Sequence, residues 1–323
     1  MHKTNSTVDD ELLRWLLDGD PAIRWRVLRD LTGAAGRDVT RERARVATEG
    51  WGARLLAAQD PDGGWGAGVY SPKWTSTTYT LLRLLWLGLP PGHPGALRGC
   101  EQLWQWRARW RVPETCGAGL LVRLTSFQRY DAAGLDDVVA YLLDQQLADG
   151  GWNCATRTDK GKHSSFHTTI QVLEALDGYA SAGGRVDAVE PMRRGREFFL
   201  RHRLYQSHRT GEVAIRGSLR FPAFPEWHFD VLRGLEHFCR AGAERDERLG
   251  DAVEVVRRAR RKDGRWPTYA QYPGRQWFQL ERPGPSRWNT GRALRVLHWW
   301  DRSGVSAPGT PPPATTTGAR RRP

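Results

Sequence analysis

Apolar and polar positions follow a helical period along most of the chain, in two kinds of segment. The first kind is apolar on most sides and contains the pattern apolar–Leu–X–X–Leu, usually with a charge at the third place. This pattern recurs six times, at residues 27–31, 81–85, 120–124, 172–176, 231–235 and 293–297. In the third copy the arginine comes one position later. The copies lie about 40 to 60 residues apart, the length of one helical hairpin or slightly more.

The second kind of segment is more polar and apolar on one side only, as expected for helices that face solvent. Six such segments lie before or between the copies, at residues 8–17, 41–59, 94–110, 135–147, 190–203 and 246–261. A single helical hairpin cannot bury its own apolar face, so the repeats must stack or close into a ring. We therefore expect an all-α fold, an (α/α)6 barrel or α-toroid of about twelve helices, six inner and six outer.

A second repeat lies in the connections between the helices. Residues 59–66 read QDPDGGWG, residues 146–153 read QLADGGWN, and residues 261–266 are a degenerate copy, RKDGRW. A glycine in the left-handed conformation ends the outer helix, and a second glycine permits a tight turn. The tryptophan can then pack under the helix end.

Composition narrows the class of protein. Hydrophobic residues make up 39% of the 323 residues, which fits one globular domain at 1–302. Residues 303–323 are rich in Pro, Thr and Arg and are predicted to be a disordered tail. The chain shows no apolar run that could cross a membrane and no signal sequence at its start, so we expect a cytoplasmic protein. The four cysteines are then free thiols or ligands.

The net charge and the aromatic content indicate what kind of partner the protein binds. The net charge is +13, and the positive charge is nearly all arginine, spread along the whole chain. No nucleic-acid-binding motif accompanies it, so we expect an anionic or apolar small molecule as the partner and no nucleic acid. The 16 tryptophans exceed what an ordinary core needs and are typical of a protein that lines a roomy apolar cavity or anchors many helix ends.

The repeats and the glycine–tryptophan turns resemble the terpene-cyclase and protein-prenyltransferase repeat superfamily, over roughly residues 10–300. The turns are similar to the glutamine–tryptophan (QW) signature of squalene cyclases, and the chain is similar to small bacterial prenyltransferase-like proteins. The resemblance implies a squalene-cyclase-like α/α-barrel that acts on an isoprenoid. The acidic motifs of terpene cyclases are not matched, because the pairs Asp9-Asp10 and Asp136-Asp137 have no third aspartate in register.

In such a barrel the inner helices point the same way, so the residues just ahead of each leucine repeat should converge at one mouth. These residues are rich in chemical groups. The candidate catalytic residues are His167, His228, Asp230 and Cys116. The candidate substrate-binding residues are Trp74, Trp227, Trp288, Asn289, Arg287, Lys162 and Arg157. Aromatic faces can stabilise a carbocation, and an isoprenoid-binding pocket is expected to include Trp25 as well.

A zinc site is one hypothesis for this mouth. His163 and His167 are four residues apart on one helix face, and Cys154 directly precedes that helix. Phe166-His167-Thr168 resembles the Tyr-His-Thr context of the zinc-ligating histidine in protein prenyltransferases, although their Asp-X-Cys pair has no counterpart. Cys154, His163 and His167 are the candidate ligands, with Cys116 or His228 as alternatives.

An anion site is a second hypothesis. The loop with Arg157, Lys160 and Lys162 places three cations beside a helix N-terminus, where a diphosphate or carboxylate could bind with Arg287 opposite. His228 and Asp230 could act as a general acid and its orienting partner, but positions two apart on a helix do not face each other. Each would need a partner from another helix.

Three functions stay open on these residues. The first is a prenyltransferase- or terpene-cyclase-like enzyme with an isoprenoid or other apolar substrate in an aromatic-lined cavity. The second is a zinc-dependent transferase or hydrolase that uses the Cys/His cluster. The third is a non-catalytic barrel that binds a small ligand.

Overall fold

The computed structural model describes residues 9–109, 114–154 and 162–303. Regular structure in these residues is almost entirely α-helical, as the sequence predicts. The two strands, β1 (Trp266–Pro267) and β2 (Pro285–Ser286), are two residues long and pair antiparallel. No helix in the described part of the chain is both long and apolar enough to span a membrane.

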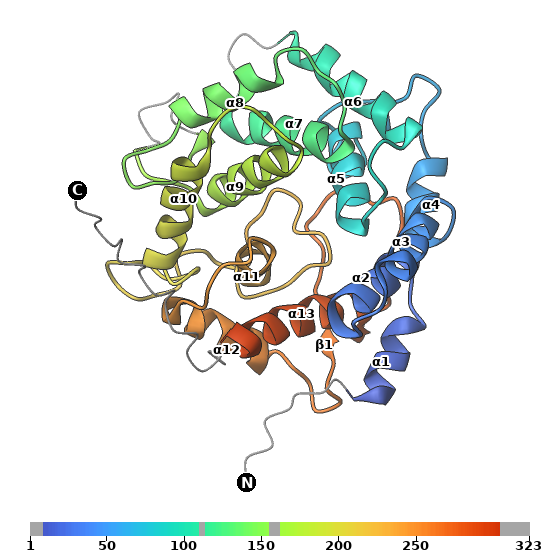
Figure 1. The fold of residues 1–323 in the computed structure, drawn as a ribbon, viewed down its shortest axis with the longest axis vertical. Coiled ribbons are helices and arrows are strands. Elements are labelled where there is room, and N and C mark those ends of the chain that lie inside the picture. Colours follow the sequence, from blue (N-terminus) through green and yellow to red (C-terminus); the bar gives the residue numbers. More distant parts are fainter. Residues whose placement is uncertain (1–8, 110–113, 155–161, 304–323) are drawn as a thin grey trace, which may run out of the picture.

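All six leucine-repeat copies lie in helices that face the middle of the molecule (Figure 1). These helices are α2 (Pro21–Leu31), α5 (Thr77–Leu87), α7 (Thr115–Gln128), α9 (Phe166–Ser181), α11 (Val231–Arg240) and α13 (Arg287–Ser303). Contacts run from α5 to α7, α9, α11, α13 and α2 in turn. At the remaining junction, the Trp25 indole on α2 donates a hydrogen bond to the Leu87 carbonyl at the end of α5.

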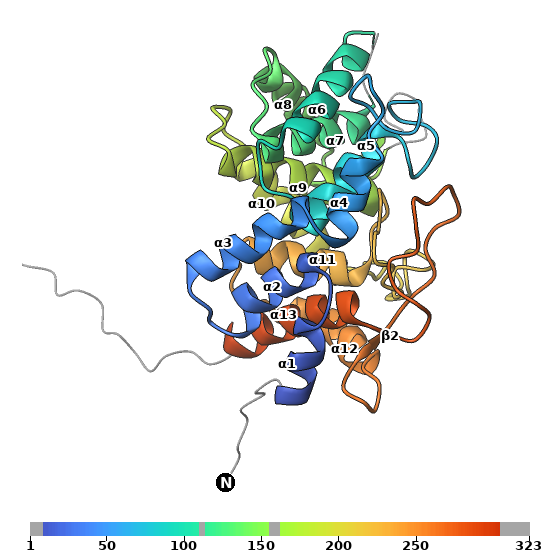
Figure 2. The ribbon, with the colours of Figure 1, turned by 90° about the vertical axis from the view of Figure 1, so that its right-hand side faces the viewer.

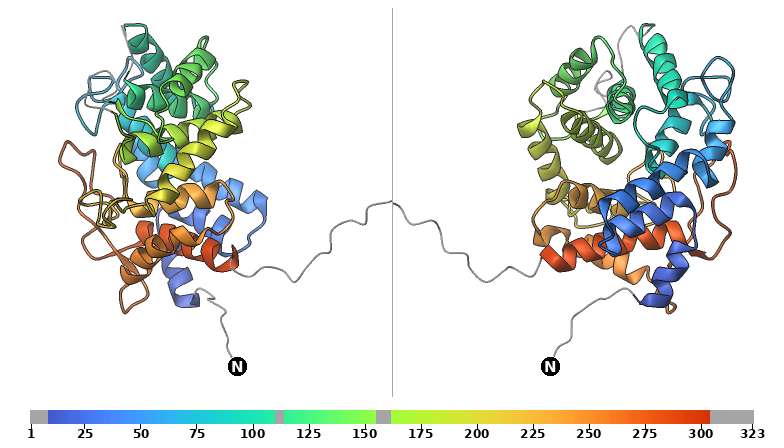
Figure 3. Two further views of the ribbon diagram at one scale, coloured as in Figure 1. Left: turned by 90° about the vertical axis from the view of Figure 1, so that its left-hand side faces the viewer. Right: turned by 45° about the vertical axis from the view of Figure 1, so that its right-hand side comes forward.

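The polar segments form helices on the outside (Figure 1). These are α1 (Asp10–Leu17), α3 (Gly36–Ala44), α4 (Gly50–Ala57), α6 (Pro94–Arg107), α8 (Leu135–Asp144), α10 (Val189–Arg201) and α12 (Gly250–Arg258), with the short 3-10 helices η1 (Arg45–Ala47) and η3 (Glu247–Leu249). Figure 3 shows α13 beside α1 and α2, so the last helix meets the first two.

The expectation of one outer helix over 41–59 is wrong, because the chain turns between η1 and α4. Gly50 has φ +64°, and its position is fixed by Asp20, whose carboxylate accepts a hydrogen bond from the Trp51 amide at 2.8 Å. The same carboxylate caps α2 by accepting from the Ala22 amide. One aspartate therefore organises two helix starts, a long-range contact that a local pattern does not reveal.

The glycine–tryptophan turns form as predicted, three times over. Trp65, Trp152 and Trp266 are fully buried, and each indole donates to a backbone carbonyl ten residues earlier in the outer helix. Each tryptophan amide also donates to a threonine hydroxyl of the following inner helix. The glycines that precede these tryptophans adopt positive φ angles at Gly63, Gly150 and Gly264. Each turn thus ties an outer helix to the inner helix that follows it.

Glutamine completes two of these turns. The Gln59 amide donates to Gly63 and to Gly95 at the start of α6, and the Gln146 amide donates to Gly150 and to Pro191 in α10. Neighbouring outer helices are linked in this way. In the third turn Arg260 takes the place of the glutamine and donates to the Gly264 carbonyl.

The connections that lead into α5, α11 and α13 lie together on one side of the molecule (Figure 2). Backbone hydrogen bonds join two of them, from the Trp74 amide to the Arg275 carbonyl at 2.9 Å and from the Arg275 amide to the Lys73 carbonyl at 2.7 Å. The Gln271 side chain accepts from the Phe224 amide and connects the third. These connections cover the end at which the inner helices begin.

Candidate functional site

A cavity of about 650 Å³ lies in the middle of the molecule, between the inner helices. All six inner helices contribute to its wall, together with residues from α3 and α10. Among the described residues that line it, ten are arginines and three are acidic. The arginines are Arg26, Arg29, Arg43, Arg123, Arg129, Arg196, Arg233, Arg240, Arg292 and Arg295, and the acids are Glu174, Asp177 and Glu236.

The charged positions of the leucine repeat supply much of this wall. Arg29, Arg123, Glu174, Arg233 and Arg295 are the charged residues of five copies, and all of them line the cavity. The remaining copy carries Arg83, which lines a different pocket. The apolar neighbours of each charge pack against the surrounding helices, so the repeat places one polar group per inner helix toward the centre.

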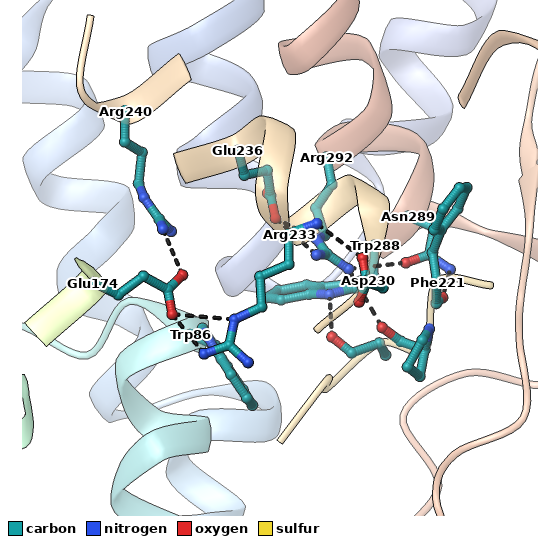
Figure 4. Close-up of polar contacts among 12 residues, drawn as sticks. Trp86, Glu174, Phe221, Asp230, Arg233, Glu236, Arg240, Trp288, Asn289 and Arg292 are labelled. Atoms are coloured by element: carbon teal, nitrogen blue, oxygen red, sulfur yellow. Dashed lines mark hydrogen bonds and ion pairs between the residues drawn. The ribbon is translucent and has the colours of Figure 1, made fainter. Parts of the chain in front are cut away.

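Glu174 on α9 holds three of the arginines. Its carboxylate pairs with Arg123 at 2.8 Å, with Arg233 at 2.6 Å and with Arg240 at 2.6 Å. Figure 4 shows Arg233 and Arg240 reaching this carboxylate from α11. Burial alone raises the pKa of the Glu174 carboxyl, but the three guanidinium groups hold it well below its usual range. Glu174 is therefore ionised and fully occupied by structural partners.

A second pair lies on the α11–α13 side of the cavity. The Arg292 guanidinium donates to the Glu236 carboxylate at 2.7 and 3.0 Å (Figure 4). Beside them the Asp230 carboxylate caps α11 by accepting from the Arg233 amide at 2.8 Å. Burial raises the pKa of Asp230 to about 6, although Arg292 opposes this shift. Its second oxygen has no hydrogen-bond partner among the described residues.

Three arginines of the wall, Arg26, Arg43 and the exposed Arg129, have no carboxylate partner in the part of the chain that the structure describes. Arg26 donates to the backbone carbonyls of Ala22, Trp86 and Leu87, and Arg43 donates to those of Gly88 and Leu89. Helix C-termini attract cations, which explains why arginines gather at the end of α5. Carbonyl groups compensate a full positive charge only in part, so this side of the cavity keeps an excess of positive charge.

The unfavourable energy of this excess positive charge lowers the pKa values of the arginines. Burial lowers the pKa of Arg26 and Arg43, and it lowers that of Arg123 to about 9. Nearby arginines lower these pKa values further, Arg29 in the case of Arg26 and Arg43. Guanidinium groups do not release their proton in proteins, so these shifts describe a charge that is held in an unfavourable place. An anion in the cavity would relieve it.

Tryptophans form the apolar part of the wall. Trp25, Trp86 and Trp288 all line the cavity and are at most 9% exposed. The Trp86 ring stacks on Phe224 with 5.6 Å between centroids. The Arg26 guanidinium lies 4.5 Å from the Trp25 ring and 4.9 Å from the Trp288 ring. Of the four tryptophans expected in an isoprenoid pocket, Trp25 and Trp288 line this cavity, whereas Trp74 and Trp227 do not.

A second pocket of about 410 Å³ lies under the connection between β1 and β2. Most of its wall is apolar and comes from residues 268–283, with Leu55 and Phe224 beside them. Arg83 forms its charged end and pairs with the buried Glu226 at 2.5 Å. Burial raises the pKa of Glu226 to about 7 against the opposing effect of Arg83. The stacked Trp86 and Phe224 rings border the two pockets, because Trp86 lines one and Phe224 the other.

The residues predicted at the mouth of the inner-helix N-termini do gather, but they pack on one another. The His228 ring is stacked between Trp227 at 3.6 Å and Tyr272 at 3.5 Å, and Trp74 and His167 lie at its edges. None of these five residues lines either of the two pockets described above. Burial lowers the pKa of His228 to about 3 and that of His167 to about 4.

The hydrogen bonds of the two histidines define what they can do. The His167 Nδ1 atom accepts from the Phe229 amide at 2.8 Å, so a proton on the neutral ring is on Nε2. The His228 Nδ1 atom has no partner among the described residues. His228 and Asp230 do not hydrogen-bond each other in the described structure, as their spacing indicated, and Asp230 instead faces Arg292. Catalytic roles for these residues stay predictions.

The predicted metal ligands come together only in part. Cys154 approaches Cys116, whose amide donates to the Cys154 sulfur at 3.1 Å. His163 is exposed, and its carbonyl accepts from Asn153. Within residues 9–109, 114–154 and 162–303, no group of three or more Cys, His, Asp or Glu side chains is placed to hold a metal ion. The triad of Cys154, His163 and His167 is therefore not assembled in this structure.

Where the structure describes them, the remaining predicted binding residues line neither of the two pockets. Arg287 donates to the Trp15 carbonyl at 2.7 Å and pairs with Asp18, which ties α13 to α1. Asn289 donates to the Phe221 and Pro267 carbonyls. Lys162 is exposed, and Arg157 lies outside the described residues.

The sequence interpretation missed Arg26, Arg43, Arg240 and Arg292 as parts of a site. The regular charge within the leucine repeat was the signal that could have found the cavity. Five of the six repeat charges meet around the central cavity, and only Arg83 lies at the other pocket.

No protein-family model matches the chain, and no curated protein matches it. Among solved structures, a crystal structure of a protein from Actinoplanes is similar, with a TM-score of 0.43 and 18% sequence identity. The match covers 88% of this chain and 90% of that chain. A similarity of this degree carries no information on function.

Proposed function

We propose that the protein is an (α/α)6 barrel whose central cavity binds an anionic small molecule with an apolar body. The observation that carries this proposal is the excess of ten arginines over three acids around a cavity of about 650 Å³. Most of these arginines are directed inward from helices that are far apart in sequence. Structural pairing accounts for part of the set, but the remainder is not compensated.

The chemistry of the wall favours a phosphate or diphosphate as the anionic group. Guanidinium groups bind phosphate oxygens through paired, charge-assisted hydrogen bonds. Arg26 and Arg43 approach the cavity from two helices without a carboxylate partner in the described structure, and the exposed Arg129 joins them in the wall. Several cations from different directions suit a group that carries more than one negative charge.

The tryptophans favour an apolar body attached to that anion. Trp25, Trp86 and Trp288 all line the same cavity. An isoprenoid diphosphate combines both features, and it agrees with the superfamily that the repeats resemble. We infer that such a compound, or one of similar chemistry, is the substrate or ligand. A prenyltransferase- or terpene-cyclase-like reaction then depends on whether catalytic groups reach it.

The other two functions have narrower support. A zinc-dependent enzyme is supported by the contact between Cys116 and Cys154, which supplies only two ligands. A non-catalytic binding barrel is supported by the state of the cavity acids, because Glu174 and Glu236 are both engaged by arginines. Binding and catalysis therefore need separate tests.

Two arginines on α3 provide the test of binding. Arg43 lines the cavity, whereas Arg41, two residues earlier, is exposed and pairs with Asp38 on the same helix. Titration calorimetry with inorganic diphosphate and with farnesyl diphosphate is expected to show binding of both, tighter for the compound with the apolar chain. Arg43→Gln should weaken binding by about ten-fold or more, since a hydrogen bond to a charged group contributes roughly 1.5–3 kcal/mol. Arg41→Gln should leave affinity unchanged.

Three results distinguish the alternatives. Equal weakening by the Arg43 and Arg41 substitutions would mean a diffuse attraction to a basic protein and would overturn the cavity site. Binding of farnesol as tight as farnesyl diphosphate would overturn the role of the anion. The third result is binding that depends on Arg43 but no reaction of the isoprenoid diphosphate, either alone or with an acceptor molecule. It would favour the non-catalytic barrel.

A further inference from the structure

We propose that Cys116 and Cys154 form a reactive dithiol, which a small-molecule disulfide oxidises to a disulfide within the chain. The two residues come from different elements. Cys116 is the second residue of α7, and Cys154 follows the glycine–tryptophan turn that contains Trp152. The Cys116 amide donates to the Cys154 sulfur at 3.1 Å, and the two thiols also hydrogen-bond each other. Both side chains are partly exposed.

The surroundings of Cys154 stabilise a thiolate on that residue. Its sulfur can accept from the Cys116 amide, from the Cys116 thiol and from the Thr168 hydroxyl at 3.5 Å. The amide belongs to the first turn of a helix, where free N–H groups favour negative charge. The hydrogen bond from Cys116 is the largest influence on Cys154 and lowers the pKa of its thiol. A thiolate is the nucleophilic form of cysteine.

Cys116 has the opposite character and keeps its proton. Its thiol lies between two acceptors, the Cys154 sulfur and the Glu114 carboxylate at 3.9 Å. The hydrogen bond to Cys154 and burial raise the pKa of Cys116, and the negative charge of Glu114 adds to the shift. The pair is therefore asymmetric, with Cys154 as the attacking sulfur and Cys116 as the second sulfur that resolves the mixed disulfide.

The other two cysteines do not share these features. Cys100 is a fully buried residue of α6, its thiol points to the Leu124 carbonyl, and burial raises its pKa to about 12. Burial also raises the pKa of Cys239 on α11. Reaction is expected at Cys154 first for these reasons.

The chemical step balances with a low-molecular-weight disulfide as the oxidant. The Cys154 thiolate attacks one sulfur of that disulfide, which forms a mixed disulfide and releases one small thiolate. The Cys116 sulfur then attacks Cys154, forms the bond within the protein and releases the second small thiol, which takes up the Cys116 proton. The two protein sulfurs are oxidised by two electrons, and the small disulfide is reduced to two thiols.

The experiment uses the full-length reduced protein in buffers of oxidised and reduced glutathione. We expect the number of free thiols to fall from the four of the sequence to two. Trypsin cuts after Arg123 and Arg129, between the two cysteines, so mass spectrometry of the digest should find a cross-linked peptide pair. Cys116→Ser should stop at a glutathione adduct on Cys154. Cys239→Ser should form the same cross-link as the unmodified chain.

The proposal fails under any of three outcomes. In the first, all four thiols stay free in oxidised glutathione, and the Cys116→Ser variant gains no glutathione adduct. In the second, the cross-link involves Cys100 or Cys239. In the third, the cross-link joins two chains, which a non-reducing gel would show. Because the main measurement is made on the unmodified protein, it does not depend on whether a variant folds. The outcome is also independent of ligand binding in the central cavity.

Discussion

At the scale of single residues, the centre of the molecule is unusual because charge takes the place of an apolar core. Glu174 contacts Arg123, Arg233 and Arg240. The side chains of Glu174, Arg123 and Arg233 are at most 4% exposed. Taking ions out of water is costly, so the buried arginines around Glu174 depend on its carboxylate. Glu174 is the shared partner, and its removal would leave three guanidinium groups without a counterion.

Glu174→Gln is therefore expected to destabilise the protein by roughly 3–5 kcal/mol, the range for removing one partner of a buried ion pair. Chemical unfolding of the two proteins would measure this difference. The matched control is Glu190→Gln, because the ion pair between Glu190 and Arg193 is mostly exposed to solvent and its loss should change stability very little. Equal stability of the Glu174 variant and the unmodified chain would show that the arginines do not need this carboxylate.

The stacked histidine gives a second prediction at this scale, on pH. The pKa of His228 falls to about 3 in the folded protein through burial, and its ordinary value is 6.5. Between these values the unfolded chain binds a proton that the folded chain does not, so this residue makes stability fall as pH decreases from 6.5 toward 3. His228→Phe keeps an aromatic ring between Trp227 and Tyr272, and it should reduce this loss.

The His228→Phe variant has to be compared with the unmodified protein, because other groups titrate in the same pH range. His167 acts in the same direction, since burial lowers its pKa to about 4. Glu226 and Asp230 act in the opposite direction, because their raised pKa values make the folded protein more stable as pH falls. Thermal unfolding of both proteins at pH 4, 5 and 7 isolates the His228 effect. A difference that is constant over these pH values would contradict the assignment.

At the scale of elements, the glycine–tryptophan turn is the unit that fixes one hairpin to the next. Gly150 has φ +98°, and a Cβ atom there would lie 2.6 Å from the Arg194 carbonyl oxygen in α10. Gly150→Ala should destabilise the protein by about 1–3 kcal/mol, because it combines a strained backbone with a steric clash. Gly178→Ala on α9 is the control. A Cβ atom there has nothing within 4 Å, so helix propensity should make the change neutral or stabilising.

The turns and the inner helices were predictable from sequence because their causes are local. Glycine conformation, tryptophan packing and the period of apolar residues all act within a few turns of helix, as at Gly150 and Trp152. The division near Gly50 was not predictable, since it depends on Asp20, thirty residues away in sequence. Cys116 was a candidate catalytic residue and Cys154 a candidate zinc ligand, but their contact depends on how α7 packs beside the turn.

The position of the cavity was the larger miss, and its reason is also physical. A helical period shows which face of a helix is buried, but it does not show which end of a group of helices is open. The inner-helix N-termini carry His167 and Trp227 and were expected to form the mouth. Instead, the connections before α5, α11 and α13 fold over that end, and their aromatic residues fill it. The cavity is instead lined by residues farther along the inner helices, such as Trp86, Arg123 and Glu174.

At the scale of the whole molecule, the net charge of +13 and the cavity are parts of one electrostatic arrangement. Ten arginines from around the cavity contribute to a positive field that extends beyond the wall. A field of this kind attracts anions, and its range shortens from about 30 Å at 0.01 M salt to about 8 Å at 0.15 M. Interactions inside the cavity are screened less than those on the outer surface.

This difference leads to a prediction for ligand-linked stability. A ligand that binds only the folded state stabilises it by about 2.7 kcal/mol at a hundred times its dissociation constant. Inorganic diphosphate should therefore raise the melting temperature by a few degrees at low salt, measured by calorimetry. Added NaCl should reduce the effect only in part, because buried contacts are weakly screened. Arg43→Gln should remove most of the increase, whereas Arg41→Gln should retain it. Complete loss of the increase at 0.15 M NaCl in the unmodified protein would place the anion on the outer surface, where exposed arginines such as Arg41 would hold it as well as the cavity does.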